Sequence, residues 1–159
     1  MANWMESWLD TLCEVMAITD PHGKQVTSYY VFKRNELPLA VSSEHIPCAI
    51  SYVNDPEVQY SEGGPLEIFW KGQTEFHLTT DVSPANIPYI LKFYEIILRA
   101  CAAQMKLGGL VAYFSILQKT ANAMQFSVYR NKDNEPDHEG ILVRWEVYQN
   151  VSGDLTVSR

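Results

Sequence analysis

The stretch that decides the fold runs from Thr80 to Gly109 and reads TDVSPANIPYILKFYEIILRACAAQMKLGG. Its apolar residues recur every three or four positions, which is the spacing of one face of an α-helix. The residues of this face are Ile87, Ile90, Leu91, Tyr94, Ile97, Leu98, Cys101, Ala102 and Met105, whereas Lys92, Glu95, Arg99, Gln104 and Lys106 lie mostly off it. The pattern predicts a core helix of about 20 residues, about 30 Å long, with one buried side.

Both ends of this helix carry start and stop signals. Asn86 is the expected N-cap, because Pro88 then falls in the first turn, where its missing N–H breaks no intrahelical hydrogen bond. Ser83 followed by Pro84 is the rival start, although it places Pro88 deeper in the helix. At the other end, Gly108 or Gly109 is suited to the left-handed conformation that closes a last turn.

A second amphipathic helix is expected at the N-terminus. The residues at helical spacing there are Trp4, Met5, Trp8, Leu9, Leu12, Cys13, Val15 and Met16. The helix is expected to end before the turn signal Pro21-His22-Gly23. Its two tryptophans can pack on the chain's own sheet or dock on a neighbouring subunit, and the first arrangement is favoured.

The remaining apolar segments alternate or are rich in β-branched residues, which indicates strands. Strands are predicted over residues 26–32, 46–53, 110–117, 124–129 and 141–148, together with a hairpin of Leu66–Trp70 and Thr74–Thr79 around Lys71-Gly72-Gln73. In the last strand Ile141, Val143, Trp145 and Val147 form one face, and Leu142, Arg144, Glu146 and Tyr148 form the other. Residues 33–45, 54–64 and 131–140 are interpreted as loops.

This order predicts the α+β class: a mixed or mostly antiparallel sheet of about six strands, with the N-terminal helix and the central core helix packed on one face. Residues 1–159 are expected to form a single domain, with residues 150–159 as a flexible C-terminal arm. Two helices leave part of such a sheet uncovered, and an open sheet face is a natural place for another subunit.

Composition narrows the classes of partner. Nineteen acidic residues against twelve basic ones give a formal charge of −7, which argues against binding to a nucleic-acid backbone, because that affinity comes from clustered Lys and Arg. No apolar run reaches the roughly 18 residues of a membrane span, and MANWMESWLD lacks the pattern of a secretory signal. The expected location is therefore the cytoplasm, with no membrane partner.

Candidate chemistry is sparse. Cys13, Cys48 and Cys101 are widely spaced in apolar settings and are interpreted as buried thiols, although Cys48 with His45 as base is the nearest thing to a catalytic thiol–imidazole pair. His77 alternates with Phe76 and Leu78 and is expected on the solvent or interface side of its strand. Asp137-His138-Glu139 is interpreted as part of a solvated acidic loop rather than a metal site. No catalytic, metal or cofactor motif is found, so no cofactor is expected.

Tyrosines are numerous, and several fall on the outward face of a predicted strand. An apolar ring with a polar tip suits protein interfaces. We expect a subunit interface to involve the N-terminal Trp4 and Trp8 region and the segment around Trp70, with Tyr29 and Tyr148 as further candidates.

The order of elements resembles that of the tail-terminator (tail-completion) proteins of long-tailed bacteriophages. The similar features are the N-terminal helix, the proline-bearing strand Ile46-Pro47-Cys48-Ala49-Ile50, a hairpin ending Phe76-His77-Leu78, the helix Ile87 to Met105 closed by Leu107-Gly108-Gly109, and the final strand from Gly140 to Val147. The resemblance implies a non-enzymatic virion protein that forms a homo-oligomeric ring, typically a hexamer. Such a ring caps the tail tube, joins it to head-connector proteins and becomes part of the virion tail. The alternatives are another head–tail connector protein, a small-ligand binding module, or a hydrolase built on Cys48 with His45 or His77 as base.

Overall fold

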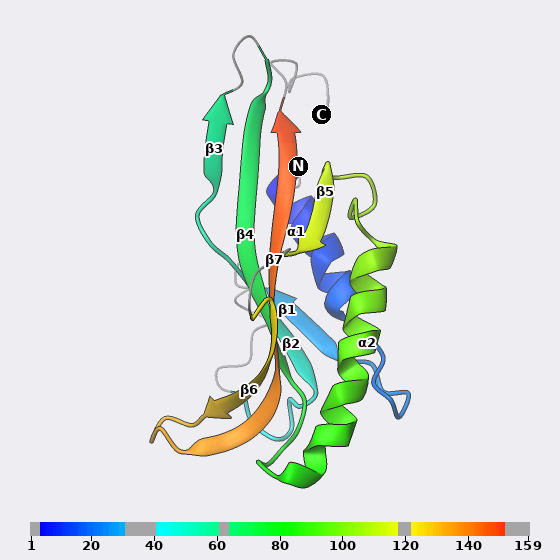
Figure 1. The fold of residues 1–159 in the computed structure, drawn as a ribbon, viewed down its shortest axis with the longest axis vertical. Coiled ribbons are helices and arrows are strands. Elements are labelled where there is room, and N and C mark those ends of the chain that lie inside the picture. Colours follow the sequence, from blue (N-terminus) through cyan, green and yellow to red (C-terminus); the bar gives the residue numbers. More distant parts are fainter. Residues whose placement is uncertain (1–3, 31–40, 61–63, 118–121, 152–159) are drawn as a thin grey trace.

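The fold is an elongated seven-stranded mixed sheet with two helices on one of its faces (Figure 1). The computed structural model describes residues 4–30, 41–60, 64–117 and 122–151. Its elements are α1 (Trp4–Met16), β1 (Thr27–Tyr30), β2 (Cys48–Val53), β3 (Glu57–Tyr60), β4 (Leu66–His77), the 3₁₀ turn η1 (Pro84–Asn86), α2 (Ile87–Ala103), β5 (Tyr113–Ile116), β6 (Met124–Arg130) and β7 (Pro136–Val151). The predicted α+β class is confirmed, with seven strands where about six were expected.

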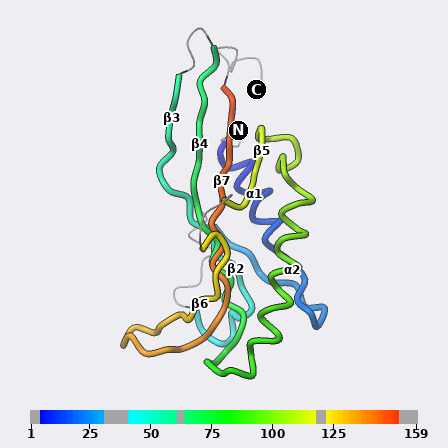
Figure 2. Tube along the Cα trace, viewed as in Figure 1, coloured from blue at the N-terminus to red at the C-terminus, as the bar shows by residue number. Residues whose placement is uncertain are grey.

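Two long strands form the spine of the sheet. β4 and β7 pair antiparallel from Leu66–Val151 to His77–Gly140 and run side by side along the long axis (Figure 2). β2 and β3 pair with successive parts of the other edge of β4, and β5 and β6 do the same on β7. β1 is parallel to β2, which makes the sheet mixed.

The core lies between the sheet and the helices and is centred on tryptophans. Trp8 of α1 is fully buried, with its ring centroid 5.9 Å from that of Trp70 and 6.2 Å from that of Trp145. The predicted inward face of the last strand is confirmed, because Ile141, Val143, Trp145 and Val147 are all fully buried. The N-terminal helix is therefore an intramolecular core element.

The start of the central helix differs from the prediction. The backbone of Asn86 is already helical and its side chain makes no capping bond. α2 nevertheless begins after Asn86 with Pro88 in its first turn, as predicted. Ser83 caps the preceding η1, because its hydroxyl accepts a hydrogen bond from the N–H of Ala85, and η1 runs directly into α2. The helix also ends earlier than expected, at Ala103. Both Gly108 and Gly109 adopt positive φ in the turn that follows.

The buried face of α2 is also narrower than predicted. It consists of Ile90, Phe93, Ile97 and Cys101, of which Phe93 was not in the predicted face. Leu91 and Leu98, which were predicted to be buried, are exposed. A helix on a sheet buries about one side chain per turn, so the apolar arc of α2 is wider than the sheet can cover.

The predicted hairpin around Gly72 is wrong, because β4 runs straight through it. Gly72 pairs with Trp145 in mid-strand, and a Cβ at this position would lie 2.5 Å from ring atoms of Trp145 and from the carbonyl oxygen of Tyr52. The glycine therefore permits a close approach of the indole ring rather than a turn.

Two predicted loops contain strand. β3 forms within residues 54–64, and β7 begins at Pro136, so that the predicted loop 131–140 shrinks to a tight turn in which Asn131 N–H bonds the Glu135 carbonyl. Asn150 and Val151, assigned to the flexible arm, belong to β7, while residues 152–159 lie outside the described residues. Most of the predicted loop 33–45 also lies outside them. No helix in the described part of the chain is long and apolar enough to cross a membrane.

Candidate functional site

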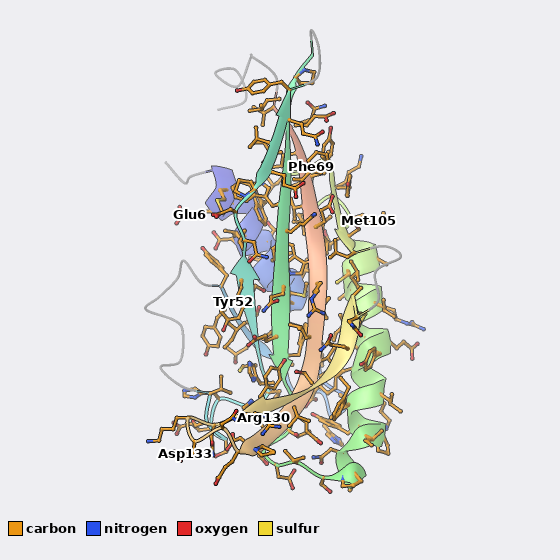
Figure 3. All side chains as sticks on the ribbon, turned by 60° about the vertical axis from the view of Figure 1, so that its left-hand side comes forward. Glu6, Tyr52, Phe69, Met105, Arg130 and Asp133 are labelled. Carbon is orange, nitrogen blue, oxygen red and sulfur yellow. The ribbon has the colours of Figure 1, made fainter. Side chains whose placement is uncertain are left out.

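The face of the sheet opposite the helices carries a row of aromatic side chains. Phe69 on β4, Tyr148 on β7 and Tyr113 on β5 lie side by side across three strands, because Phe69 pairs with Tyr148 and Tyr148 with Tyr113 in register. The ring centroids are 4.9 Å apart in the first pair and 5.2 Å apart in the second, which is stacked. Figure 3 labels Phe69 and, further along the same face, Tyr52.

Glutamates on the same strands fix the two tyrosines. Tyr148 donates a 3.0 Å hydrogen bond to Oε1 of Glu67, and Tyr113 donates a 3.1 Å bond to Oε1 of Glu146. Desolvation, reinforced by these bonds and by the carboxylate charges, raises the pKa of both phenols. The hydroxyls therefore remain protonated donors. We call the side chains Glu57, Glu67, Phe69, Lys71, Tyr113, Glu146 and Tyr148 the open face.

The predicted interface residues fall into different environments. Tyr148 belongs to the open face, and Tyr29 lies on the same side of the sheet, opposite Ile50 of β2. Both are partly exposed. Trp70 is half-buried on the helix side, where its Nε1 donates to Oε1 of Gln149. Trp8 is fully buried in its own chain, and the side chain of Trp4 lies outside the described residues.

A second feature of the sheet is a buried pair of histidines. His77 near the end of β4 and His138 near the start of β7 are each 4% exposed. Nδ1 of His77 lies 2.6 Å from Nε2 of His138, and Nδ1 of His138 lies 2.7 Å from Oδ2 of Asp137. Tyr129 of β6 packs on both rings, with centroid distances of 4.1 and 5.2 Å. The pair joins the hairpin of β6 and β7 to β4.

One arrangement of neutral tautomers satisfies both of these contacts. A proton on Nδ1 of His138 satisfies Asp137 and leaves Nε2 to accept from Nδ1–H of His77. In this arrangement Nε2 of His77 carries no proton, and it lies 3.3 Å from Oε2 of Glu75 without a hydrogen-bond partner among the described residues. Burial lowers the pKa of His138, the bond to Asp137 opposes this, and a charge on His77 lowers it further. If both histidines were positively charged, two imidazolium rings would be in contact.

The structure thus corrects the predictions for this region. His77 does lie on the face opposite Phe76, but it is buried rather than solvent-facing. His138 and Glu139 are buried strand residues, not part of a solvated loop, and Oε2 of Glu139 accepts a 2.9 Å bond from the Asn86 amide. Sequence reasoning missed the pair because 61 residues separate the two histidines. The available signal was the alternation of side chains along β4, which places His77 on the face of the sheet that points away from the core.

The Cys48–His45 pair is not formed. Cys48 is fully buried, and burial, with a contribution from the charge of Glu75, raises the pKa of its thiol to about 11. The ring of His45 lies 3.0 Å from the hydroxyl of Ser42 instead. Cys101 is also buried, with a pKa raised to about 12 by desolvation, whereas Cys13 is half-buried and contacts the hydroxyl of Ser28. Neither buried thiol is poised to form a thiolate.

A shallow cavity of about 340 Å³ lies beside the start of α2. Its lining consists of His22, Ile46, Pro47, Leu78, Thr79, Thr80, Asp81, Asn86 and Tyr89. His22 stacks on Tyr89 at a centroid distance of 5.5 Å, and Tyr89 donates to Oδ2 of Asp20. The volume is at the low end for small-molecule sites, which are about 300–1,000 Å³. No group of three or more metal-ligating side chains occurs within the described residues.

Comparison with known proteins does not assign the chain. No protein-family model matches it, and a search of curated proteins finds no match.

Proposed function

We propose that this chain is a non-enzymatic structural protein of a phage or prophage tail, which forms an oligomeric ring that caps the tail tube and joins it to the head. The open face is the observation that carries the proposal. Two stacked tyrosines and a phenylalanine lie on a sheet face over which the described residues place no helix, and they form the kind of aromatic surface that is enriched at protein interfaces. The order of helices and strands supports the same reading through its resemblance to tail terminators.

The elongated sheet supports a ring-forming role in a second way. β4 spans 12 residues and β7 spans 16, so their common axis is about 40 Å long at about 3.3 Å per residue. A sheet of this length presents a broad outer face to a neighbouring subunit, and the helices lie on its inner face. The proposed partners are further copies of the chain, the tail tube and head-connector proteins.

Sedimentation with tail tubes tests this function. Tubes assembled from the tube protein of the same phage or prophage should carry the chain into the pellet, with density at a tube end in electron micrographs. Tubes grown in its presence should also be of limited length. A chain that stays in the supernatant and leaves tube length unchanged contradicts the tail role.

A small-ligand binding module is the second candidate, and the cavity beside the start of α2 is the observation that favours it. The polar groups around it, which include Thr79, Asp81 and Asn86, suit a small polar ligand. Amide chemical shifts recorded with a library of small polar molecules test this candidate. Saturable shifts confined to the cavity lining would favour binding, and no shift at millimolar concentration would reject it.

A further inference from the structure

The surface of α2 carries a line of exposed apolar side chains. Ile87, Leu91 and Leu98 are 45–59% exposed, and their spacing places them on one flank of the helix, next to the buried line. Met105, which is 56% exposed, follows in the turn after Ala103. The opposite flank holds Tyr89, which contacts His22 and Asp20. We call the four side chains, with exposed Ala102, the helix flank. Four large apolar residues in one line form a patch rather than scattered surface residues.

The charges beside the helix flank differ in sign from those of the rest of the chain. The charged residues beside it are three bases, Lys92, Arg99 and Lys106, and one acid, Glu95. The whole chain, in contrast, has a formal net charge of −7. Arg99 binds Glu95 at 2.7 Å, which leaves the two lysines as net positive charge. The helix flank is therefore an apolar line with a basic border.

The open face has the complementary character. Its charged groups are Glu57, Glu67 and Glu146 against Lys71, which lies 3.5 Å from Glu57. Arg144, opposite Gln73 at one end of the same stretch, donates to the carbonyl of Asn122 and to Oε1 of Gln125. Glu67 and Glu146 each accept a hydrogen bond from a tyrosine hydroxyl through Oε1. Among the described residues Oε2 of each carboxylate accepts no such bond, so it can face a cation of a neighbouring molecule. The open face is therefore an aromatic row with an acidic border.

The two surfaces also match in length. α2 runs from Ile87 to Ala103, which is about 24 Å at 1.5 Å per residue. The part of β4 from Leu66 to Gln73 is about 23 Å long at 3.3 Å per residue. A helix lying along β4 and β7 would match this stretch in length and would cross the aromatic row, which runs from strand to strand.

We propose that the helix flank of one copy of this chain packs on the open face of the next copy. The two surfaces lie in different layers of the molecule, one on the helix side of the sheet and one on the bare side, so a neighbour seated on one leaves the other vacant. Such a contact is heterologous, and its repetition generates a ring or a filament rather than a closed twofold dimer. The inference rests on the proposed function, because it supplies the subunit contact of the ring.

Mixing two complementary variants tests this pairing. Leu91→Glu with Leu98→Glu disables the helix flank, and Phe69→Ser with Tyr148→Ser disables the open face. Each variant alone should be a monomer by light scattering, because one of its two surfaces is lost. A mixture should form a one-to-one complex of two chains and nothing larger, because it contains one intact pair of surfaces.

Val82→Glu is the matched control. It introduces the same charge at an apolar residue that is 43% exposed and belongs to neither surface, so it should assemble like the wild type. Circular dichroism of all variants should match the wild type, because every substituted side chain is at least partly exposed. A mixture that contains only monomers overturns the proposal, as does a wild-type chain that remains monomeric at millimolar concentration.

The outcomes separate this inference from the tail function. A wild-type ring that forms by the proposed contact but fails to bind tail tubes contradicts the tail function alone. A ring that binds tubes and is unaffected by both pairs of substitutions contradicts the proposed contact alone.

Discussion

At the scale of single residues, the centre of the sheet depends on the contact between Gly72 and Trp145. The indole of Trp145 lies on the bare Cα of Gly72, and its Nε1 donates a 3.0 Å bond to Oγ1 of Thr74, which in turn contacts the hydroxyl of Ser51 at 2.8 Å. This chain of buried polar contacts orients the ring toward Trp8. The glycine and the tryptophan therefore form one packing unit.

Gly72→Ala should destabilise the chain by about 3 kcal/mol, because the added methyl group would overlap the indole ring and a backbone oxygen. Urea unfolding measures the change. Gly23→Ala is the control, since Gly23 has positive φ but open space around its Cα. It should cost about 1 kcal/mol, from backbone strain alone. Equal losses for the two variants would contradict the packing account.

His138 makes the stability depend on pH. Its pKa is lowered on folding from the ordinary value of 6.5, so below about pH 6.5 the unfolded chain binds more protons at this site than the folded chain. The free energy of unfolding should therefore fall as the pH falls from 6.5 toward the lowered pKa, by up to about 1.4 kcal/mol per pH unit for one proton. His138→Gln should flatten the slope measured by urea unfolding in this window.

The exposed His22 provides the control for that measurement. His22→Gln should retain the wild-type slope, because the substitution leaves the buried pair intact. A His138→Gln variant with the wild-type slope would show that carboxylates alone set the acid dependence.

At the scale of elements, α2 combines a buried line and an exposed apolar flank. Phe93→Ala should cost about 3–5 kcal/mol, because it empties a fully buried site under the sheet. Leu91→Ala, two positions away and 59% exposed, should change the stability by about 0.5 kcal/mol or less. Thermal and urea unfolding of the two variants compare these positions directly. Similar losses would contradict the assigned face.

Local sequence patterns predicted most helices and strands but not how the strands pair with one another. The periodicity of residues 4–16 and 87–103 and the alternation of residues 141–148 reflect burial against one surface, so each was found from the sequence. Gly72 was misread because a turn glycine and a close-approach glycine look the same without the partner Trp145. The segment 136–140 was misread because its charges suggested solvent, whereas pairing with β4 and β6 makes it strand and buries His138, Glu139 and Gly140.

At the scale of the whole molecule, the two faces of the sheet differ: the inner face packs on the helices, and the outer face carries the aromatic row. Trp8, Phe93 and Trp145 join both helices to the inner side, while the aromatic row lies on the outer side. The uncovered face was predicted from the ratio of strands to helices. Of the aromatic row only Tyr148 was predicted as an interface residue, because the row forms only when β4, β5 and β7 are brought into register.

Electrostatic pairing between copies would make assembly sensitive to salt. The basic border of the helix flank and the acidic border of the open face are solvent-accessible, and the Debye length shrinks from about 10 Å at 0.1 M salt to about 3 Å at 1 M. We expect sedimentation to show a weaker association at 1 M sodium chloride than at 0.1 M. Stronger association at high salt would indicate a contact made by apolar groups alone.

The mass of the purified chain in solution tests the central claim most directly. Light scattering over a wide range of concentrations should give one closed species, and six copies of an 18.1 kDa chain correspond to about 109 kDa. A mass that stays at a fixed multiple of the chain as the concentration rises supports a ring. A mass of 18.1 kDa at every concentration, or a dimer that never grows, would contradict it.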